Sequence, residues 1–470
     1  MKVKLKNVGM LNEAEFEVSD LTIICGENNT GKTYAAYSLY GYLDFAKNSA
    51  RNGIYLFEDI LAKSIKYIDI VDENIITISL KNINTILDNL FDMLEQKYKT
   101  NLSLILAGRE SDFCLSEFHI NYKDIMAKYI RKKENIKLLF SNLLLFKLTE
   151  ITEHYICFRY RRNTTRRIEH IKRNFIERLA ACIIVKFYPK AFILSAERTG
   201  ASMFERELIR KRSGMFDDIS IQTNAIGKSG SVDTIPSYYP KPVMDNMKDI
   251  DRYFELTKTN SFINKEQSSL YSEIINLLYE IIGGKYVASE FGVEFTPNNT
   301  TQKTRILLQC ASSSVRSLLM LNLYILNIAK KGDILMIDEP ELNLHPNNQI
   351  LMGRLLALLV NAGVKVFITT HSDYIVRELS NCIMLNSLND EQITKLSKKT
   401  SYTKEYKLEA SKVKAYIAEN VKGKNMLNPV NIDATRGIFM KTFDSPIDTQ
   451  NENQSLIFEE IINAKDKDDK

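Results

Sequence analysis

Apolar and polar residues alternate near the start of the chain in the way expected of a pair of β-strands. The alternation runs from Val3 to Val18 and is broken at Gly9, where a turn is expected. The apolar run Leu21–Cys25 predicts a buried strand, and a helix is expected over Lys32–Ala46, after a polar loop that contains glycine. The first part of the chain is therefore predicted to form a strand–loop–helix unit of the kind found in α/β folds.

The hydrophobic pattern changes over residues 48–190. Apolar residues recur at helical spacing over Ile83–Leu94, and Met126–Leu148 also predicts a helix. Two strand-like runs, Leu102–Ala107 and Phe113–Ile120, interrupt the helical pattern, and glycine is nearly absent. We therefore predict a mostly helical insertion over this region, with the size of one small domain.

Buried strands are predicted again in the second half of the chain. Ala191–Leu194 predicts a strand that returns to the first core. Asp333–Ile337 and Val364–Ile368 predict two parallel strands, with a helix over Gln349–Val360 between them. Residues 213–246 hold most of the Gly, Pro and Ser of the middle of the chain, so a loop is expected there.

These elements indicate an α/β fold in which an insertion interrupts one core. Residues 1–47 and 191–395 are predicted to form that core, with residues 48–190 inserted and residues 396–470 as a carboxyl-terminal extension. The chain has 470 residues, of which 44% are hydrophobic, so it can bury a large core. Its 18 glycines and 9 prolines are few for this length, which favours helices over a turn-rich β fold.

Composition also bears on location and partners. No run of 18 apolar residues is present, so no membrane span is expected, and the first ten residues lack the apolar core of a signal peptide. The six cysteines lie far apart and form no Cys-x-x-Cys pair, which fits free thiols in a reducing cytoplasm. The formal net charge of +5 is too small to indicate nucleic-acid binding by overall electrostatics. We therefore expect a cytoplasmic protein with no membrane partner.

The polar loop after the first buried strand carries a phosphate-binding motif. Its sequence, GENNTGKT, matches the pattern GxxxxGK[ST], in which backbone N–H groups surround phosphate oxygens and the following helix N-terminus adds positive potential. Lys32 is expected to reach the β- and γ-phosphates, and Thr33 to bind Mg²⁺. The alternative is a chance match in a turn, which the strand before and the helix after disfavour. The residues expected to contact the nucleotide are Gly26, Asn28, Asn29, Thr30, Gly31, Lys32 and Thr33.

A second apolar strand ends in two carboxylates, as the other half of such a site requires. Asp338 is expected to join Thr33 in the Mg²⁺ shell, and Glu339 to orient and deprotonate the attacking water. His371 follows a later predicted strand, from which it could hydrogen-bond the γ-phosphate and sense its loss. An ordinary strand with a polar turn and a structural histidine remain the alternative interpretations.

A serine-rich segment precedes a predicted buried helix over Ser312–Ile328. Serines at the start of a helix ordinarily serve as caps. Exposed hydroxyls and N–H groups at a helix start can also bind phosphate, so Ser312 and Ser313 are candidate phosphate contacts.

The order of these motifs resembles the heads of ABC-type ATPases, and among them the branch of RecF, SMC-like and OLD-family proteins. The resemblance covers about residues 1–47 and 190–385, and it includes the phrase DEPELNLHP at Asp338–Pro346 and the strand and turn at Leu5–Gly9. It implies an α/β P-loop NTPase fold of the ABC-type ATPase head. It also implies that ATP and Mg²⁺ bind between two such heads. The similarity is greatest to ATPase subunits of bacterial anti-phage systems, such as PtuA of Septu or AriA of PARIS.

The resemblance also implies a role for the serine-rich segment. Ser312 falls where the family has the serine of its LSGGQ motif, although Ser313 and Ser314 replace the two glycines and Val315 replaces the glutamine. Ser312 and Ser313 are therefore implied to contact the γ-phosphate bound by a partner protomer. That arrangement requires an ATP-dependent homodimer or a higher oligomer of this chain.

Another segment, LSAERTG at residues 194–200, resembles a motif of the same defence ATPases. Its Glu197 and Arg198 either face the nucleotide or form a structural ion pair. No glutamine that would correspond to the family's Q-loop can be identified in the sequence.

A cluster of basic residues lies within the predicted insertion, close to Tyr155, Phe158 and Tyr160. Such a cluster could bind the phosphate backbone of DNA or RNA while an aromatic ring stacks on a base. A docking surface for an acidic partner and a solvated helix face are the alternatives. The cluster consists of Arg159, Arg161, Arg162, Arg166, Arg167, Lys172 and Arg173.

Three functions are compatible with these features. The resemblance favours an ATPase of anti-phage defence whose nucleotide state controls a separate effector chain, such as an HNH or Toprim nuclease. A DNA-repair or DNA-clamping ATPase and an ATP-binding scaffold with slow turnover are the alternatives. No intrinsic nuclease is expected, because Asp466, Asp468 and Asp469 lie in a charged tail and the ATP site already uses Asp338 and Glu339.

Overall fold

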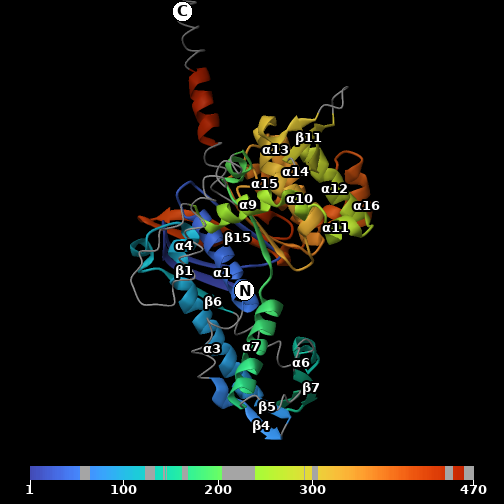
Figure 1. Ribbon diagram of the computed structural model, residues 1–470. Helices are drawn as coiled ribbons and strands as arrows, with labels where there is room; N and C mark the ends of the chain where they lie inside the picture. Colours follow the sequence, from blue (N-terminus) through green and yellow to red (C-terminus); the bar gives the residue numbers. More distant parts are fainter. Residues whose placement is uncertain are drawn as a thin grey trace, which may run out of the picture.

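The computed structural model of the protein describes residues 1–52, 64–72, 74–121, 133–140, 143, 146–160, 168–203, 239–289, 292–298, 305–439 and 448–459. A nine-stranded sheet runs through the body of the molecule (Figure 1). In spatial order its strands are β6 (Glu117–Asn121), β1 (Lys2–Val8), β2 (Leu11–Glu17), β16 (Lys424–Val430), β15 (Val413–Val421), β3 (Leu21–Gly26), β14 (Lys365–Thr370), β13 (Ile334–Asp338) and β9 (Ala191–Leu194).

One half of this sheet is parallel and the other half is mainly antiparallel. Strands β15, β3, β14, β13 and β9 all pair in parallel, whereas β6, β1 and β2 pair in antiparallel register. The predicted first strand pair and the predicted parallel strands are confirmed by this topology. Because the strands of the parallel half point the same way, their carboxyl ends meet along one edge of the sheet.

Both faces of the parallel half are covered, and the sequence alternation explains how. In β13, Ile334 and Met336 belong to one hydrophobic core, whereas Leu335 and Ile337 belong to the other. The first core contains residues of α1 (Lys32–Asn52), α3 (Leu80–Lys99), α4 (Leu102–Leu106) and α7 (Ile168–Phe187). The second core contains residues of α9 (Lys241–Asp251), α12 (Ser269–Ile282), α13 (Ser313–Leu323), α14 (Pro346–Asn361) and α15 (Asp373–Leu385).

The smaller elements complete the described fold. A π-helical turn at Tyr324–Ile328 continues α13. The remaining α-helices of the described ranges are α6 (Lys133–Phe140), α10 (Tyr253–Leu256), α11 (Phe262–Lys265) and α16 (Asp390–Ser397), and a further helix spans residues 448–459. A three-stranded sheet comprises β10 (Gly284–Ser289), β11 (Gly292–Pro297) and β12 (Ile306–Leu307), and β17 (Ile432–Asp433) pairs with β18 (Gly437–Ile438). Within the described ranges, no helix combines the length and the apolar character that crossing a bilayer requires.

The region predicted as a mostly helical insertion holds more β-structure than expected. It contains a four-stranded sheet in the order β4 (Asp69–Asp72), β5 (Ile75–Ser79), β8 (Tyr155–Tyr160) and β7 (Phe146–Ile151). Figure 1 shows α3 and α7 leading from the main sheet to this small sheet. Its strands are short, and the helical spacing of the neighbouring α3 dominates the sequence pattern.

Several predicted elements within or near this region are wrong. Leu102–Ala107 forms α4 and not a strand, because a short apolar run suits a buried helical turn as well as a strand. Of the run Phe113–Ile120, only the part from Glu117 onward is strand, and it pairs with β1 at the edge of the main sheet. Of the helix predicted over Met126–Leu148, the part in α6 is confirmed and the part from Phe146 is wrong, because β7 begins there; residues 126–132 lie outside the described residues.

Two predictions at later positions also need correction. The loop predicted over residues 213–246 gives way to helix α9 from Lys241, and its earlier part lies outside the described residues. The extension predicted from residue 396 supplies β15 and β16, which lie inside the main sheet between β3 and β2. The core therefore continues well past the predicted boundary at residue 395.

The close contact between β15 and the phosphate-binding loop explains one glycine of the motif. Gly26 has a φ of 137°, and a Cβ atom on it would lie 2.1 Å from the carbonyl oxygen of Ala418 in β15. Asn425, in the next strand, donates from its side chain to the carbonyl oxygen of Asn29 at 3.1 Å. The carboxyl-terminal strands thus support the loop directly.

Candidate nucleotide-binding and hydrolysis site

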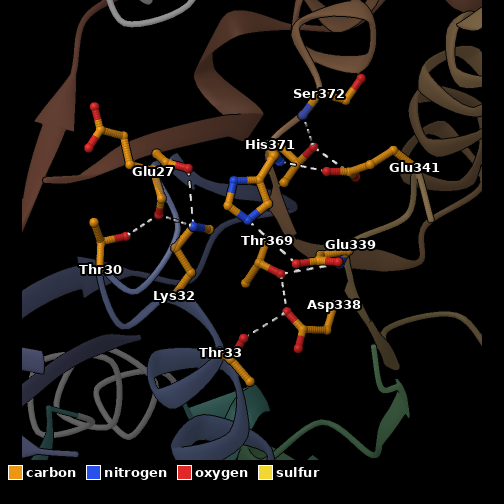
Figure 2. Close-up of polar contacts among 12 residues, drawn as sticks. Glu27, Thr30, Lys32, Thr33, Asp338, Glu339, Glu341, Thr369, His371 and Ser372 are labelled. Atoms are coloured by element: carbon orange, nitrogen blue, oxygen red, sulfur yellow. Dashed lines mark hydrogen bonds and ion pairs between the residues drawn. The ribbon is translucent and has the colours of Figure 1, made fainter. Parts of the chain in front are cut away.

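Three neighbouring parallel strands bring the predicted motifs to one edge of the sheet. Strand β3 leads into the phosphate-binding loop, β13 ends at Asp338, and β14, which pairs with both of them, ends at Thr370. His371 therefore lies between the loop and Glu339 (Figure 2). The prediction that His371 follows a strand is confirmed, and that strand, β14, pairs directly with the strand that ends in Asp338.

The loop folds around the side chain of Lys32, which is only 5% exposed. Its Nζ donates to the carbonyl oxygens of Gly26 at 3.1 Å and Glu27 at 2.5 Å, and the hydroxyl of Thr30 donates to the same Glu27 carbonyl at 2.7 Å. Positive φ values at Asn29 (62°) and Gly31 (94°) give the loop its curled path. The ammonium group is thereby held inside the loop.

Burial lowers the pKa of Lys32, while the nearby Glu339 and Asp338 carboxylates act in the opposite direction. A partly desolvated ammonium group interacts strongly with an anion, since less water screens it. The arrangement is suited to binding phosphate.

Asp338 meets Thr33 across the sheet edge. The Thr33 hydroxyl donates to Asp338 Oδ1 at 3.4 Å, and the Thr369 hydroxyl donates to the same oxygen. The second oxygen, Oδ2, is buried and has no hydrogen-bond partner among the described residues. Burial raises the pKa of Asp338 to about 6.

These two side chains fit a magnesium ion that also takes ligands from phosphate and water. Mg²⁺ in nucleotide sites is bound by one or two protein oxygens and keeps the rest of its octahedral shell for phosphate oxygens and water. The unpaired, buried Oδ2 of Asp338 is such an oxygen. Within the described ranges, no group of three or more His, Cys, Asp or Glu side chains could hold a metal ion without such added ligands.

Glu339 and His371 form the next pair. His371 Nε2 lies 3.4 Å from Glu339 Oε1, and the hydrogen bond from this ring is the main cause that lowers the pKa of Glu339. The backbone of Glu339 is in the left-handed region, with a φ of 54°, which is unusual for a residue with a Cβ atom. A carboxylate kept ionised at this place can accept a proton from water.

Two residues of this edge were missed by the sequence analysis. The carboxylate of Glu341 accepts hydrogen bonds from the His371 backbone N–H at 2.5 Å and from the Thr370 hydroxyl at 2.9 Å, so it fixes the start of the histidine turn. Thr369 bonds to Asp338, as described above. The Thr-Thr-His ending of the strand was the available signal, but the pairing of β13 with β14 was needed to interpret it.

The serine-rich segment shows the capping geometry. Ser312 is the N-cap of α13: its hydroxyl oxygen accepts from the Val315 N–H at 3.3 Å, and it lies 2.9 Å from the hydroxyl of Ser314. Ser312 is exposed and Ser313 is half-buried. A helix start with accessible hydroxyl groups can serve as a cap and still face a phosphate group from another molecule.

Glu197 and Arg198 play different parts. Glu197 Oε2 accepts from the Tyr37 hydroxyl at 3.0 Å. Arg198 is buried and donates to backbone carbonyl groups, among them that of Glu339. The ion pair considered for this segment is therefore not the role of Arg198.

The basic cluster is only partly described. Arg161, Arg162, Arg166 and Arg167 lie outside the described residues. Arg159 is exposed on β8, and Lys172 and Arg173 are half-buried on α7. These three lie on β8 and α7 of the inserted region and not on the strands that carry the nucleotide motifs.

Comparisons with known proteins agree with this arrangement. The family model of the AAA ATPase domain matches residues 1–376. No curated protein matches the chain.

Solved structures of SMC heads are also similar. One is an SMC head bound to the C-terminal winged-helix domain of ScpA (12% identity, 91% of this chain and 97% of that chain covered, TM-score 0.34). Another is the SMC head domain from Thermotoga maritima (11% identity, 92% and 98% covered, TM-score 0.30). A third is an SMC head with an extended coiled coil, bound to the C-terminal domain of ScpA derived from Pyrococcus furiosus (10% identity, 96% and 98% covered, TM-score 0.30).

The matched range of the family model includes the phosphate-binding loop, Asp338, Glu339 and His371. The fold around them is an α/β P-loop ATPase fold. The chain belongs to the AAA ATPase domain family.

Proposed function

We propose that this ATPase binds Mg²⁺ and ATP along the edge formed by β3, β14 and β13 and hydrolyses the γ-phosphate bond there. The observation that carries the proposal is the meeting of Thr33 with Asp338, 305 positions apart in sequence, through a hydroxyl–carboxylate contact of 3.4 Å. Such a pair can provide the protein ligands of a Mg²⁺ ion. Lys32 lies near Asp338, where its ammonium group can bind the phosphates.

Each residue then has a separate part in the reaction. Lys32 balances phosphate charge in the ground state and in the transition state. Glu339 orients a water molecule and takes its proton, and His371, within 3.4 Å of that carboxylate, keeps it ionised and faces the γ-phosphate. When bound, Mg²⁺ would neutralise charge on the phosphate oxygens.

The first test separates binding from hydrolysis. Lys32→Ala is expected to lose ATP binding, because the loop then has no cation for the phosphates. Glu339→Gln is expected to retain binding and to lower kcat at least about 100-fold, since the amide cannot accept the proton of water. Equilibrium binding of a fluorescent ATP analogue and phosphate release measure the two effects.

Matched controls come from an exposed surface pair. Lys4 and Glu15 are 2.8 Å apart on the antiparallel part of the sheet and are both exposed. Lys4→Ala and Glu15→Gln should leave binding and turnover unchanged. A Glu339→Gln variant with the turnover of the unsubstituted protein would remove Glu339 from the proposed mechanism.

We further propose that two copies of the chain enclose the nucleotide, each presenting Ser312 and Ser313 to the phosphate bound by the other. The resemblance to ABC-type heads and the exposed start of α13 support this. ATP would then control association of the heads, and ATP hydrolysis would release them.

For the biological role, we propose anti-phage defence in which the ATP state controls a separate effector chain. The motif resemblance to defence ATPases supports this proposal. Capture from native cells with Glu339→Gln, which should remain ATP-bound, tests it. A nuclease or toxin chain retained by this variant and absent with Lys32→Ala would support defence, whereas recovery of DNA-repair proteins would favour a repair ATPase.

A further inference from the structure

The side chain of Arg198 joins three separate parts of the ATPase core. It lies just after β9 and is only 3% exposed. Each of its hydrogen bonds described here goes to a backbone carbonyl oxygen, so the guanidinium group holds main chain rather than other side chains. The acceptors are the carbonyl groups of Ser195 (2.9 Å), Ser317 (3.1 Å), Asp338 (2.7 Å) and Glu339 (2.7 Å).

The shape of the guanidinium group explains this arrangement. Its N–H groups lie in one plane and point in fixed directions, so it can reach several acceptors at once, whereas a lysine ammonium group is a compact point on a flexible stem. Asp338, Glu341 and Glu339 are the anions that favour the charged form of the buried Arg198. Two of these carboxylates, Asp338 and Glu339, belong to residues whose main chain Arg198 holds.

The bond to Glu339 matters because the backbone of that residue is strained. With a φ of 54°, Glu339 keeps its conformation only if its surroundings hold it. The N–H of Glu339 donates to the carbonyl oxygen of Thr369 at 3.1 Å, and its carbonyl oxygen accepts from Arg198. The two bonds fix the main chain on both sides of the Cα atom, which sets the direction of the carboxylate.

We propose that Arg198 is a positioning residue for ATP hydrolysis, which holds the main chain of Glu339 in place and links it to α13. The inference rests on the proposed role of Glu339. Arg198 does not touch the nucleotide in this arrangement. It acts through the residue that takes the proton from water.

The link to α13 adds a consequence for regulation. Ser317 lies in the helix that begins at Ser312 and Ser313, the serines proposed to face the partner's nucleotide. A displacement of α13 relative to β13 stretches the bonds that Arg198 makes. The orientation of Glu339 in one active site therefore depends on the position of the helix that contacts the other active site.

The test compares Arg198→Met and Arg198→Lys with a matched control. Arg354 is a largely covered arginine, with 13% of its side chain exposed, and it pairs with Glu378 at 2.6 Å on helices α14 and α15, so Arg354→Met reports the general effect of losing an arginine that is mostly shielded from solvent. Both Arg198 variants are expected to bind the ATP analogue within about 3-fold of the unsubstituted protein. Their kcat should fall about 10–100-fold, as expected for a misplaced catalytic group, with KM nearly unchanged.

A double-mutant cycle shows whether Arg198 acts through Glu339. In the Glu339→Gln background, Arg198→Lys should lower the residual rate by less than about 3-fold, because the group that it positions is already missing. If Arg198→Met does not fold, the lysine variant alone completes the cycle. A purely structural role would instead lower the melting temperature and the affinity for ATP together, as Arg354→Met could.

The outcomes distinguish failure of the positioning role of Arg198 from failure of the proposed function. If Glu339→Gln lowers turnover but the folded Arg198 variants keep the kcat of the unsubstituted protein, or if the two effects multiply in the double variant, the positioning role is wrong and the proposed function stands. If Glu339→Gln has no effect on turnover, both the proposed mechanism and the role of Arg198 fail.

Discussion

Asp338 is a carboxylate that the nucleotide-free protein holds at an energetic cost. Burial raises its pKa from 3.8 to about 6, and one of its oxygens is buried without a hydrogen-bond partner among the described residues. A bound cation would remove this cost, since it supplies the opposite charge that the site lacks. The burial of this carboxylate should therefore lower the free energy of unfolding by a measurable amount.

The raised pKa predicts a specific dependence of stability on pH. Between about pH 4 and 6 the folded protein holds a proton on Asp338 that the unfolded chain has released, so this residue makes the free energy of unfolding fall as the pH rises. In protein treated with EDTA and without nucleotide, the free energy of unfolding of Asp338→Asn should therefore rise by about 1–3 kcal/mol relative to that of the unsubstituted protein when the pH is raised from 4.5 to 7.5. Urea unfolding at both pH values measures it.

The ligand supplies the control for this prediction. Adding Mg²⁺ and ATP at pH 7.5 should reverse the order, because the Asp338→Asn variant lacks the charge that binds the cation. An equal difference between the two proteins at both pH values would show that Asp338 is not titrating in this range.

Part of the candidate site could be located from the sequence because its motifs are local. The phosphate-binding loop, the Asp338–Glu339 pair and His371 each follow a recognisable apolar strand, so neighbouring residues in the sequence were enough to find them. Thr369 could not be found in this way, and the contacts of Arg198 could not be assigned, although the segment that holds it was recognised. Their partners lie 31 and 141 positions away and become neighbours only through the pairing of strands.

At the scale of secondary-structure elements, the largest error was the position of the core boundary. Strand β15 lies directly beside β3 in the middle of the sheet, although almost 400 residues separate them. The pattern of Val413–Val421 permits a strand, but a parallel partner that is distant in sequence leaves no local signal. For the same reason the short strands of the small sheet were less visible than the long amphipathic helix α3.

The corrected boundary predicts the outcome of truncation. A chain that ends at residue 395 loses β15 and β16, which leaves β3 as an unpaired edge and removes buried residues such as Tyr416 and Leu427 from the core. It should aggregate or lack a cooperative unfolding transition. A chain that ends at residue 439 keeps both strands and should unfold cooperatively.

Thermal unfolding, monitored by circular dichroism, compares the cooperativity of the two truncated proteins, and size-exclusion chromatography compares their aggregation. A soluble, cooperatively folded protein ending at residue 395 would show that the two strands are not needed for the core.

At the scale of the whole molecule, the proposed shared active sites predict complementation between two inactive variants. Ser313→Phe should leave ATP binding to one copy nearly intact and prevent ATP-dependent association, because the bulky ring fills the space meant for the partner's phosphate. Mixed with Lys32→Ala, it should recover part of the ATPase activity. One site of the mixed dimer then combines an intact loop with an intact serine segment.

A matched substitution tests the specificity of this effect. Ser111, an exposed serine in the turn after α4, gives the control Ser111→Phe, which should associate normally. If the mixture of the two inactive variants recovers no activity at any ratio, the shared site is excluded.

Because the effector is proposed to be a separate chain, we predict that the purified protein does not cut DNA. Metal nucleases use clustered carboxylates, and among the described residues no group of three or more His, Cys, Asp or Glu side chains is placed to hold a metal ion. Plasmid DNA incubated with the protein, ATP and Mg²⁺ or Mn²⁺ should stay intact, with Lys32→Ala as the control. Cleavage that persists in Lys32→Ala and stops with EDTA would indicate a nuclease site elsewhere in the chain.

The central place of β15 in the sheet has a consequence for folding during translation. Strand β3, which carries the phosphate-binding loop, leaves the ribosome long before both of its neighbours, β14 and β15, are made, because they follow it far along the sequence. At ordinary rates of translation, roughly 20–80 s pass between them. During that time the apolar strand lacks both of its neighbours in the sheet, so a nascent chain depends on chaperones or transient contacts, and ATP is expected to bind only after β14 and β15 have been made.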